Sequence, residues 1–333
     1  MLVPQLRFLA LLFLLSTGAL AAERAAVDHG PLEATAVSSI SDSTEPSDCP
    51  DEDNCTCDKG RLLGILAPTN TDYSAFISPM TNPVFFEDPR TLTEARVIFV
   101  HHTVPDRAPL AGGDVNLIAA QVRAALTDRL SIIATKDGFF TFSNEIPLDA
   151  NDGWADIAAG LKYNLYSDPC RQRLLSAGAT FEMPVGSPRA LQGNGSGEFN
   201  LFLTGGTQLG ERAHFVTAAG LRLPADDVEE SQVAYWSAHL DTQLRESRWY
   251  VFGETNWYHW MNSGEALPLS IEGLDVFNFG SANVAGNDIV SGAVGFKFKP
   301  TVLNEIGVAF EVPLTDRRDV LEDRLTVDCI IRY

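Results

Sequence analysis

The sequence predicts an all-β fold, a transmembrane antiparallel up-and-down β-barrel of about twelve strands with short periplasmic turns and longer extracellular loops. Three observations predict this fold. The chain ends on a strand, Leu325 to Tyr333, in which apolar residues recur at almost every second position and the last residue is aromatic. From Thr93 onward, segments of about 11 to 14 residues alternate in the same way. Short and long connections between these segments follow each other without a break.

Composition and charge narrow the classes of function. With 333 residues, 45% of them hydrophobic and 20% charged, the chain has a globular composition. Its net charge of -20 argues against nucleic acid, because so acidic a chain would repel a run of phosphates. The same charge argues against docking on an anionic inner leaflet. We therefore expect no nucleic-acid partner.

The N-terminus carries an export signal. Arg7 precedes an apolar run from Phe8 to Leu20, and Ala19 to Ala22 offers small residues for cleavage, so we interpret residues 1–22 as a signal peptide. No later segment approaches the ~20 continuous apolar residues that a transmembrane helix needs, so only a closed barrel could span a membrane. We expect the protein in the outer membrane, with membrane lipid and the barrel-assembly machinery as partners.

Residues 23–58 form an acidic segment rich in Ser, Thr and Pro, which we expect to be a disordered periplasmic tail. The segment contains Cys49, Cys55 and Cys57. A metal site is conceivable there, but export favours disulfides, and Cys170, in a predicted turn on the same side of the membrane, is the fourth candidate. Four cysteines allow three pairings, among which the sequence does not choose. Cys329, on the apolar face of the last strand, is left free.

Residues 59–92 lead from the tail to the barrel. Four prolines, Pro68, Pro79, Pro83 and Pro89, prevent any long regular element. Phe76, Phe85 and Phe86 are apolar enough to pack against something. The segment either leads up to the rim of the barrel or folds into its mouth as a partial plug, and the sequence leaves both arrangements open.

Two kinds of connection join the strands of the predicted barrel, residues 93–333. The tight turns are Leu126–Arg129, Ser167–Cys170, Leu209–Arg212, Arg245–Ser247 and Lys299–Thr301. The longer connections are Pro105–Gly113, Ser143–Asp152, Gly186–Gly197, Pro224–Glu230, Met261–Gly286 and Thr315–Leu321. This alternation is typical of outer-membrane barrels, and an even strand number places both termini in the periplasm.

Charged residues fall on one face of each predicted strand. In the eleventh strand, Ile306, Val308 and Phe310 alternate with Glu305 and Glu311. A soluble barrel would hold the apolar set inside and a membrane barrel would hold the charges inside, and the pattern does not distinguish the two. For a membrane barrel, the lumen-facing candidates are Arg123, Lys162, Glu182, Glu198, His214, Arg222, His239, Asp241, Glu254, Lys297, Glu305, Glu311 and Arg332.

The lumen allows two interpretations. A barrel of about twelve strands encloses more space than an eight-stranded one, so it has room for a narrow water-filled path. The opposed charges either line that path or pair into a network that braces or closes it. Because the set is mixed in sign, it does not define a selectivity.

Two neighbouring strands resemble a known family. The run from Gly153 to Leu165, G-W-A-D-I-A-A-G-L-K-Y-N-L, is followed by Met183-Pro184-Val185-Gly186. Together they resemble the G-x-G-D-L-x-x-G-x-K-Y-x-L and L-P-x-G patterns of the outer-membrane barrel family named for the MetA pathway of phenol degradation. Ala155 stands where the family has Gly, and residues before about Thr93 lie outside the resemblance. The resemblance implies a porin-like transporter for passive passage of small molecules, hydrophobic or aromatic ones among them.

An outer-membrane barrel could also be a lipid hydrolase or a structural or adhesive protein. A lipid hydrolase would need a nucleophile and a base, and Ser237, His239 and Asp241 share one face of a strand. Such neighbours are roughly 6.6 to 7 Å apart, which is long for direct hydrogen bonds. We therefore expect no catalytic residue, and likewise no metal and no cofactor. The other class is a structural or adhesive barrel with a closed lumen, in which the apolar loop from Asn262 to Gly286 meets a partner or forms a lid.

The last strand is expected to close the barrel. It pairs with the first strand, near Glu94 to Val104, and so removes the open edges of the sheet. Tyr333 is then a C-terminal assembly signal at the periplasmic rim.

Overall fold

The computed structural model describes residues 60–107, 110–143 and 150–333. The chain divides into two units, residues 1–52 and 53–333, and all described residues belong to the second. The predicted signal peptide and the acidic tail with Cys49, Cys55 and Cys57 lie outside the described residues.

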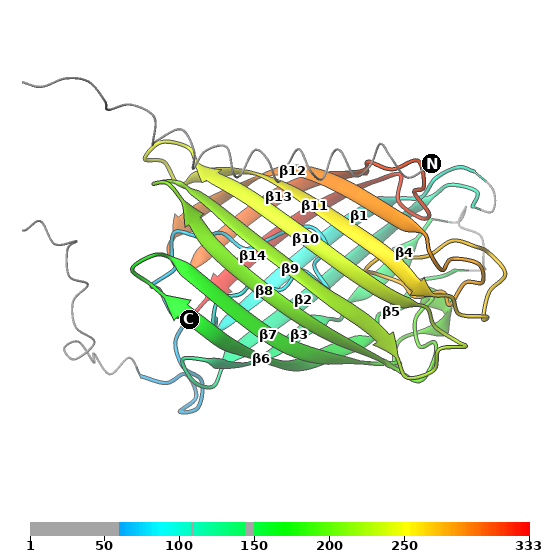
Figure 1. Cartoon of the computed structure of the whole chain (residues 1–333), viewed down its shortest axis with the longest axis horizontal. Helices are drawn as coiled ribbons and strands as arrows, with labels where there is room; N and C mark the ends of the chain where they lie inside the picture. The colour runs from blue at the N-terminus through cyan, green and yellow to red at the C-terminus, as the bar shows by residue number, and fades with distance from the viewer. Residues whose placement is uncertain (1–59, 108–109, 144–149) are drawn as a thin grey trace, which may run out of the picture. The chain divides into compact units, whose positions relative to one another are not determined.

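The described residues form a closed antiparallel β-barrel (Figure 1). Its strands are β1 (Glu94–Thr103), β2 (Asp114–Ala125), β3 (Leu130–Lys136), β4 (Phe139–Phe142), β5 (Gly153–Trp154), β6 (Ile157–Asp168), β7 (Arg173–Met183), β8 (Glu198–Leu209), β9 (Ala213–Pro224), β10 (Gln232–Gln243), β11 (Trp249–Asn262), β12 (Asp288–Thr301), β13 (Asn304–Pro313) and β14 (Asp323–Arg332). β3 and β4 together make one strand of the wall, and β5 and β6 make the next, so the barrel has 12 strands. The predicted fold class is confirmed.

The barrel closes because its last strand pairs with its first. β14 runs antiparallel to β1, from Arg332 opposite Glu94 to Asp323 opposite Thr103. β1 pairs with β2 on its other side, so the sheet continues around the wall. Closure gives the edge strands hydrogen-bonding partners, which a membrane-spanning sheet requires. No helix among the described residues is both long and apolar enough to cross a membrane.

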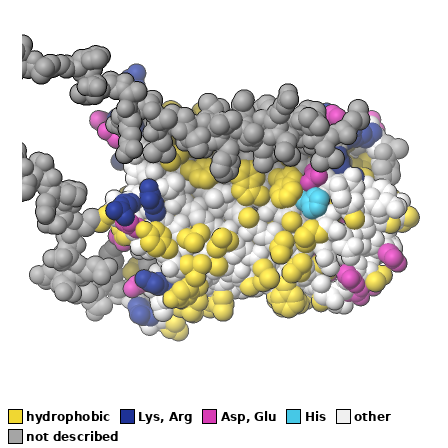
Figure 2. Space-filling model, viewed as in Figure 1, with side chains coloured by type: hydrophobic (Ala, Val, Ile, Leu, Met, Phe, Trp, Pro, Cys, Tyr) yellow, Lys and Arg dark blue, Asp and Glu magenta, His cyan; other side chains and the backbone are white. Residues whose placement is uncertain are grey.

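The apolar side chains of the wall face outward. In β13, Ile306, Val308 and Phe310 are 40 to 49% exposed, whereas Glu305 and Glu311 are buried. Figure 2 shows hydrophobic side chains spread over the outer surface of the strands. An apolar surface of this kind is unfavourable in water and suits a bilayer. The alternation in the sequence therefore has the orientation of a membrane barrel, with charges inside.

The short turns all lie at one end of the barrel, together with the start of β1 and the end of β14; this is called the short-turn end below. One predicted turn is wrong. Lys299–Thr301 belongs to β12, and the turn to β13 lies at Val302 and Leu303 instead. A register shift between Phe298 and Thr301 accommodates Pro300, which has no amide hydrogen for the ladder.

The wall is interrupted at two neighbouring places that the sequence pattern did not predict. The breaks fall between β3 and β4 and, on the adjacent strand, between β5 and β6. Gly138 lies in the first break with a φ of 116°. A Cβ at this position would lie 2.4 Å from the Ile118 carbonyl oxygen, so the backbone approach requires glycine. The breaks give this part of the wall fewer ladder hydrogen bonds than the rest.

Candidate functional site

Residues 67–93, called the plug below, lie inside the barrel. The two ends of the plug meet at the short-turn end, where Thr93 Oγ1 donates to the Ala67 carbonyl at 2.6 Å. The Thr69 amide donates to the main-chain oxygen of Tyr333 at 2.6 Å. Between these ends, Ile77 and Met80 are completely buried. Of the two arrangements that the sequence left open for this segment, the structure has the plug.

Glu87 of the plug pairs with two cations of the wall. Arg123 of β2 donates from Nε to Glu87 Oε1 at 2.8 Å and from Nη2 to Oε2 at 2.6 Å. Lys162 of β6 donates to Glu87 Oε1 at 2.7 Å. Burial alone would raise the pKa of Glu87, but the charges of Arg123 and Lys162 outweigh it and lower this pKa. Glu87 is thus held as a carboxylate between two cations of the wall.

The last two strands bind the plug at a second place. Arg332 donates from Nη1 to Glu305 at 2.6 Å, from Nε to Glu94 at 2.7 Å and from Nη2 to Ser78 Oγ at 2.8 Å. The Ser78 amide in turn donates to Glu305 Oε2 at 3.0 Å. Arg332, which pairs with Glu94 of the first strand, therefore also holds the plug through Ser78.

Glu254 of β11 holds the turn of the plug at Met80 and Thr81. Its carboxylate accepts hydrogen bonds from the amides of Met80 at 2.8 Å and Thr81 at 2.6 Å. His239 Nδ1 lies 2.6 Å from Glu254 Oε1, and its Nε2 lies 3.2 Å from Asp241. An acid of the wall thus caps two amides that would otherwise be buried without partners.

The set Ser237, His239 and Asp241 does not assemble as a nucleophile, base and acid. Ser237 Oγ accepts a hydrogen bond from Asn82 of the plug at 2.9 Å. Within the described part of the chain, no hydrogen bond joins Ser237 to His239. Nor do three or more His, Cys, Asp or Glu side chains of that part group together in a way that could hold a metal ion.

Residues 263–287, between β11 and β12 and called the lid below, fold into the opposite mouth of the barrel. Leu274 and Phe277 of the lid are buried, and the Phe277 ring lies 5.2 Å from that of Phe140 in the wall. Asp275 pairs with Arg324 of β14 at 2.9 Å. The apolar residues that the sequence places in this loop therefore pack inside the mouth.

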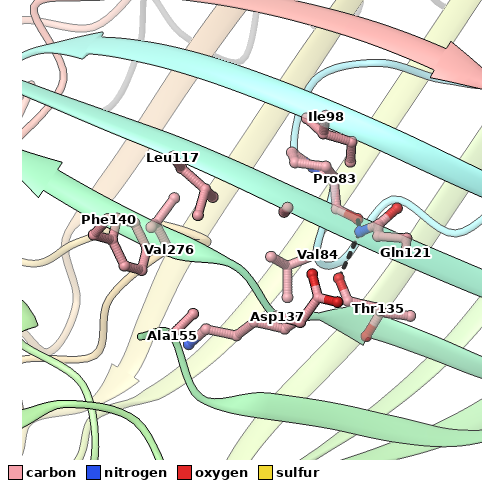
Figure 3. Close-up of a pocket in the computed structure, with 12 residues that line it drawn as sticks. Pro83, Val84, Ile98, Leu117, Gln121, Thr135, Asp137, Phe140, Ala155 and Val276 are labelled. Atoms are coloured by element: carbon pink, nitrogen blue, oxygen red, sulfur yellow. Dashed lines mark hydrogen bonds between the residues drawn. The ribbon is translucent and has the colours of Figure 1, made fainter. Parts of the chain in front are cut away.

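A small pocket remains where plug, wall and lid meet (Figure 3). It is lined by Pro83, Val84, Ile98, Leu117, Ala119, Gln121, Thr135, Lys136, Asp137, Phe140, Ala155 and Val276. Most of this lining is apolar, and Thr135, Asp137 and Ala155 place the pocket beside the two interruptions of the wall. Its volume of about 20 Å³ is enough for about one water molecule.

The predicted lumen-facing residues all lie on the buried face of their strands. Arg123, Lys162, Glu182, Glu198, His214, Arg222, His239, Asp241, Glu254, Lys297, Glu305, Glu311 and Arg332 are each at most 8% exposed. Sequence reasoning missed Arg324 and Asp328, although the two-residue period of the last strand aligns them with Arg332. It also missed Glu87, because no periodic pattern marks the plug.

The remaining predicted site residues lie at the short-turn end or on the outer wall. Tyr333 is partly exposed, and its hydroxyl donates to the Gly60 carbonyl at 2.7 Å. Cys170 lies in the turn between β6 and β7, where Gln172 donates to the carbonyl of Asp72 at 2.9 Å. Cys329 is a free, exposed thiol on the outer face of β14.

The barrel is similar to solved outer-membrane proteins. An outer membrane channel from Pseudomonas putida is 13% identical over 78% of this chain and 100% of that chain, with a TM-score of 0.51. The likeness shows the fold. The translocator domain of the autotransporter NalP from Neisseria meningitidis is 11% identical over 72% and 88% of the two chains, with a TM-score of 0.38. The Pseudomonas putida toluene transporter TodX is 8% identical over 80% and 94%, with a TM-score of 0.34. No family model and no curated protein matches the sequence.

Proposed function

We propose that this protein is an outer-membrane channel for the passive passage of small, apolar molecules, as its resemblance to the MetA-pathway barrel family implies. The observation that carries the proposal is the pocket between plug, wall and lid. Val84, Ile98, Leu117, Phe140 and Val276 offer an apolar solute a lining that a water-filled pore would lack.

The charges of the lumen also support an apolar solute. Arg123 is paired with Glu87 and Glu94, Lys162 with Glu87, and Arg332 with Glu94 and Glu305, so three cations face three carboxylates. Cations that are already paired with buried carboxylates do not attract a passing ion, so this lumen is poorly suited to charged solutes.

The path of such a solute would follow the pocket. The pocket lies beside the interruptions of the wall, where fewer ladder hydrogen bonds hold the strands. Because it has room for about one water, passage requires Val84 of the plug or Val276 of the lid to move.

The second candidate function is a structural or adhesive barrel with a closed lumen. The observation that favours it is that ion pairs and hydrogen bonds tie the plug to β2, β6, β11, β13 and β14. In that case the lumen network only braces the wall, and no solute crosses.

Uptake of N-phenylnaphthylamine, a small apolar dye that fluoresces in membranes, separates the two candidates. Cells that produce the protein should take up the dye faster than cells with an empty vector. Ala119→Leu, which fills the pocket, should remove the difference, and Ala120→Leu, which faces outward from the same strand, should keep it. A folded protein that gives no faster uptake than the empty vector would favour the closed barrel.

A further inference from the structure

Arg222 of β9 contacts both the plug and the lid. Its Nη1 donates to the lid carbonyls of Leu274 at 3.3 Å and Phe277 at 3.2 Å. Its guanidinium carbon lies 5.4 Å from the centre of the Phe85 ring in the plug. Its Nη2 donates to Glu198 of the neighbouring strand β8.

Glu198, the ion-pair partner of Arg222, makes a further contact with the lid. Its second oxygen accepts a hydrogen bond from Asn278 Nδ2 at 2.8 Å. Asn278 Nδ2 also donates to the Ser231 carbonyl at 3.0 Å, next to the start of β10. The Arg222–Glu198 pair therefore binds the lid through three of its residues.

Phe85 of the plug contacts two side chains of the wall, Arg222 and Tyr235. Its ring stacks on that of Tyr235, with 4.9 Å between the centres, while Arg222 covers the same ring. Tyr235 is fixed by a hydrogen bond from its hydroxyl to Asn200 at 2.9 Å. Phe85 is thus enclosed by groups of the wall that have partners of their own.

Plug and lid also share one apolar core. Val84 and Phe85 of the plug belong to the same buried cluster as Leu274, Val276 and Phe277 of the lid. If either segment leaves, the other loses apolar contacts and Arg222 loses partners. Loss of the lid leaves guanidinium donors of Arg222 without their carbonyl acceptors, and loss of the plug removes the Phe85 ring that covers the guanidinium, so either loss disturbs the contacts that remain.

We propose that plug and lid are two halves of one gate and that Arg222 couples them. Release of the plug loosens the lid, and lifting the lid loosens the plug. Arg222 is a positioning residue in this gate: it binds lid carbonyls and the plug ring at the same time. The coupling does not depend on which solute passes, or on whether one passes at all.

Hydrogen–deuterium exchange of the folded full-length protein in detergent tests the coupling. The readouts are the plug amides of residues 76–88 and the lid amides of residues 271–281. Phe85→Ala disturbs the plug and should also speed exchange in the lid. Asn278→Ala disturbs the lid and should also speed exchange in the plug. We expect changes of about two- to tenfold, the range of one net hydrogen bond.

Two control variants each disturb one segment through a contact that does not involve Arg222. Tyr73→Phe removes a plug hydroxyl that bonds Ser167 at 2.8 Å near the short-turn end, and it should leave exchange in the lid unchanged. Arg317→Gln removes a hydrogen bond to the lid carbonyl of Ser270 at 2.9 Å, and it should leave exchange in the plug unchanged. A heat-dependent gel shift identifies folded barrel for every variant.

The role of Arg222 is tested in a background with Arg222→Gln and Glu198→Gln together, which removes both charges and keeps polar groups. There, Phe85→Ala should no longer speed exchange in the lid. If the lid responds as strongly as before, direct apolar packing transmits the change and Arg222 is not the coupler. If Phe85→Ala in the original background speeds exchange in the plug alone, plug and lid are independent and the proposal is overturned.

Discussion

The carboxylate of Asp156 accepts a hydrogen bond from the Gly186 amide at 2.7 Å. These residues belong to the two separate parts of the sequence motif that resembles a transporter family, so the motif includes a contact between the break before β6 and the loop after β7. The same carboxylate accepts from the Gly193 amide at 3.0 Å, and the Asp156 amide donates to Gln192 at 3.1 Å. Asp156 therefore holds this loop against the interrupted part of the wall.

Gly186→Ala should destabilise the barrel. A Cβ on Gly186 would lie 2.8 Å from the Asp156 nitrogen and 2.7 Å from the Gln192 Cβ. Such overpacking costs about 1 to 3 kcal/mol of the free energy of unfolding, measured by denaturant titration in detergent. Gly253→Ala is the matched control, because the nearest atom to its Cβ would be 3.8 Å away, and it should change stability little. Equal stability of the two variants would contradict this prediction.

Glu87→Gln should release the plug. The change leaves Arg123 and Lys162 buried without Glu87's charge, and breaking buried pairs in this way costs about 3 to 5 kcal/mol. Planar bilayers should show a higher conductance for the variant than for the original protein. Asp72→Asn, on an exposed part of the plug, is the control and should leave conductance unchanged. No change with Glu87→Gln would mean that other contacts suffice to hold the plug.

Acid should weaken the plug. The pKa of Glu87 is lowered in the folded protein, because Arg123 and Lys162 outweigh the effect of burial. A lowered acid pKa gives stability that is present above the unfolded value, about 4.3, and is lost as the pH falls through the folded value. Proteolysis of the plug should therefore be faster near pH 3 than at pH 7, with an acid-stable protease as the probe. Plug cleavage that is faster at pH 7 than at pH 4 would contradict the prediction that acid weakens the plug.

Cys170 should form a disulfide with Cys49, Cys55 or Cys57. The turn that carries Cys170 contacts the start of the plug through Gln172 and Asp72, and Gly60 lies at the same end beside Tyr333. The three candidate partners precede Gly60 by 11, 5 and 3 residues. Peptide mass spectrometry without reduction should identify the pair, and alkylation should label Cys329 instead.

Deletion of Tyr333 should impair insertion into the outer membrane. Its amide donates to the Thr93 carbonyl at 2.9 Å and its main-chain oxygen accepts from Thr69, so it joins the last strand to both ends of the plug. Tyr333→Phe keeps these contacts and the aromatic ring and should insert normally. Outer-membrane fractionation with the heat-dependent gel shift measures the amount inserted, and normal insertion of the shortened chain would refute the idea.

Much of the wall could be predicted because its signals are local. A strand places successive side chains on opposite faces, so the period of two already assigned Glu305 and Glu311 to one face and Phe310 to the other. Tight turns need particular residues at particular positions, which is why most connections were located. The turn predicted at Lys299–Thr301 was wrong. Pro300 indicates a turn, but a register shift lets β12 continue through it.

By itself, the sequence determined the strands, their two faces, the alternation of turns and loops, and the pairing of the last strand with the first. Only the tertiary structure decided which face lies inside, that residues 67–93 fill the lumen, and where β3–β4 and β5–β6 are interrupted. The physical reason is the range of the interactions. The period of two depends only on residues close together in the sequence. The contacts inside the barrel join residues far apart in the sequence, such as Glu87 with Lys162 and Arg222 with Phe85 and Phe277.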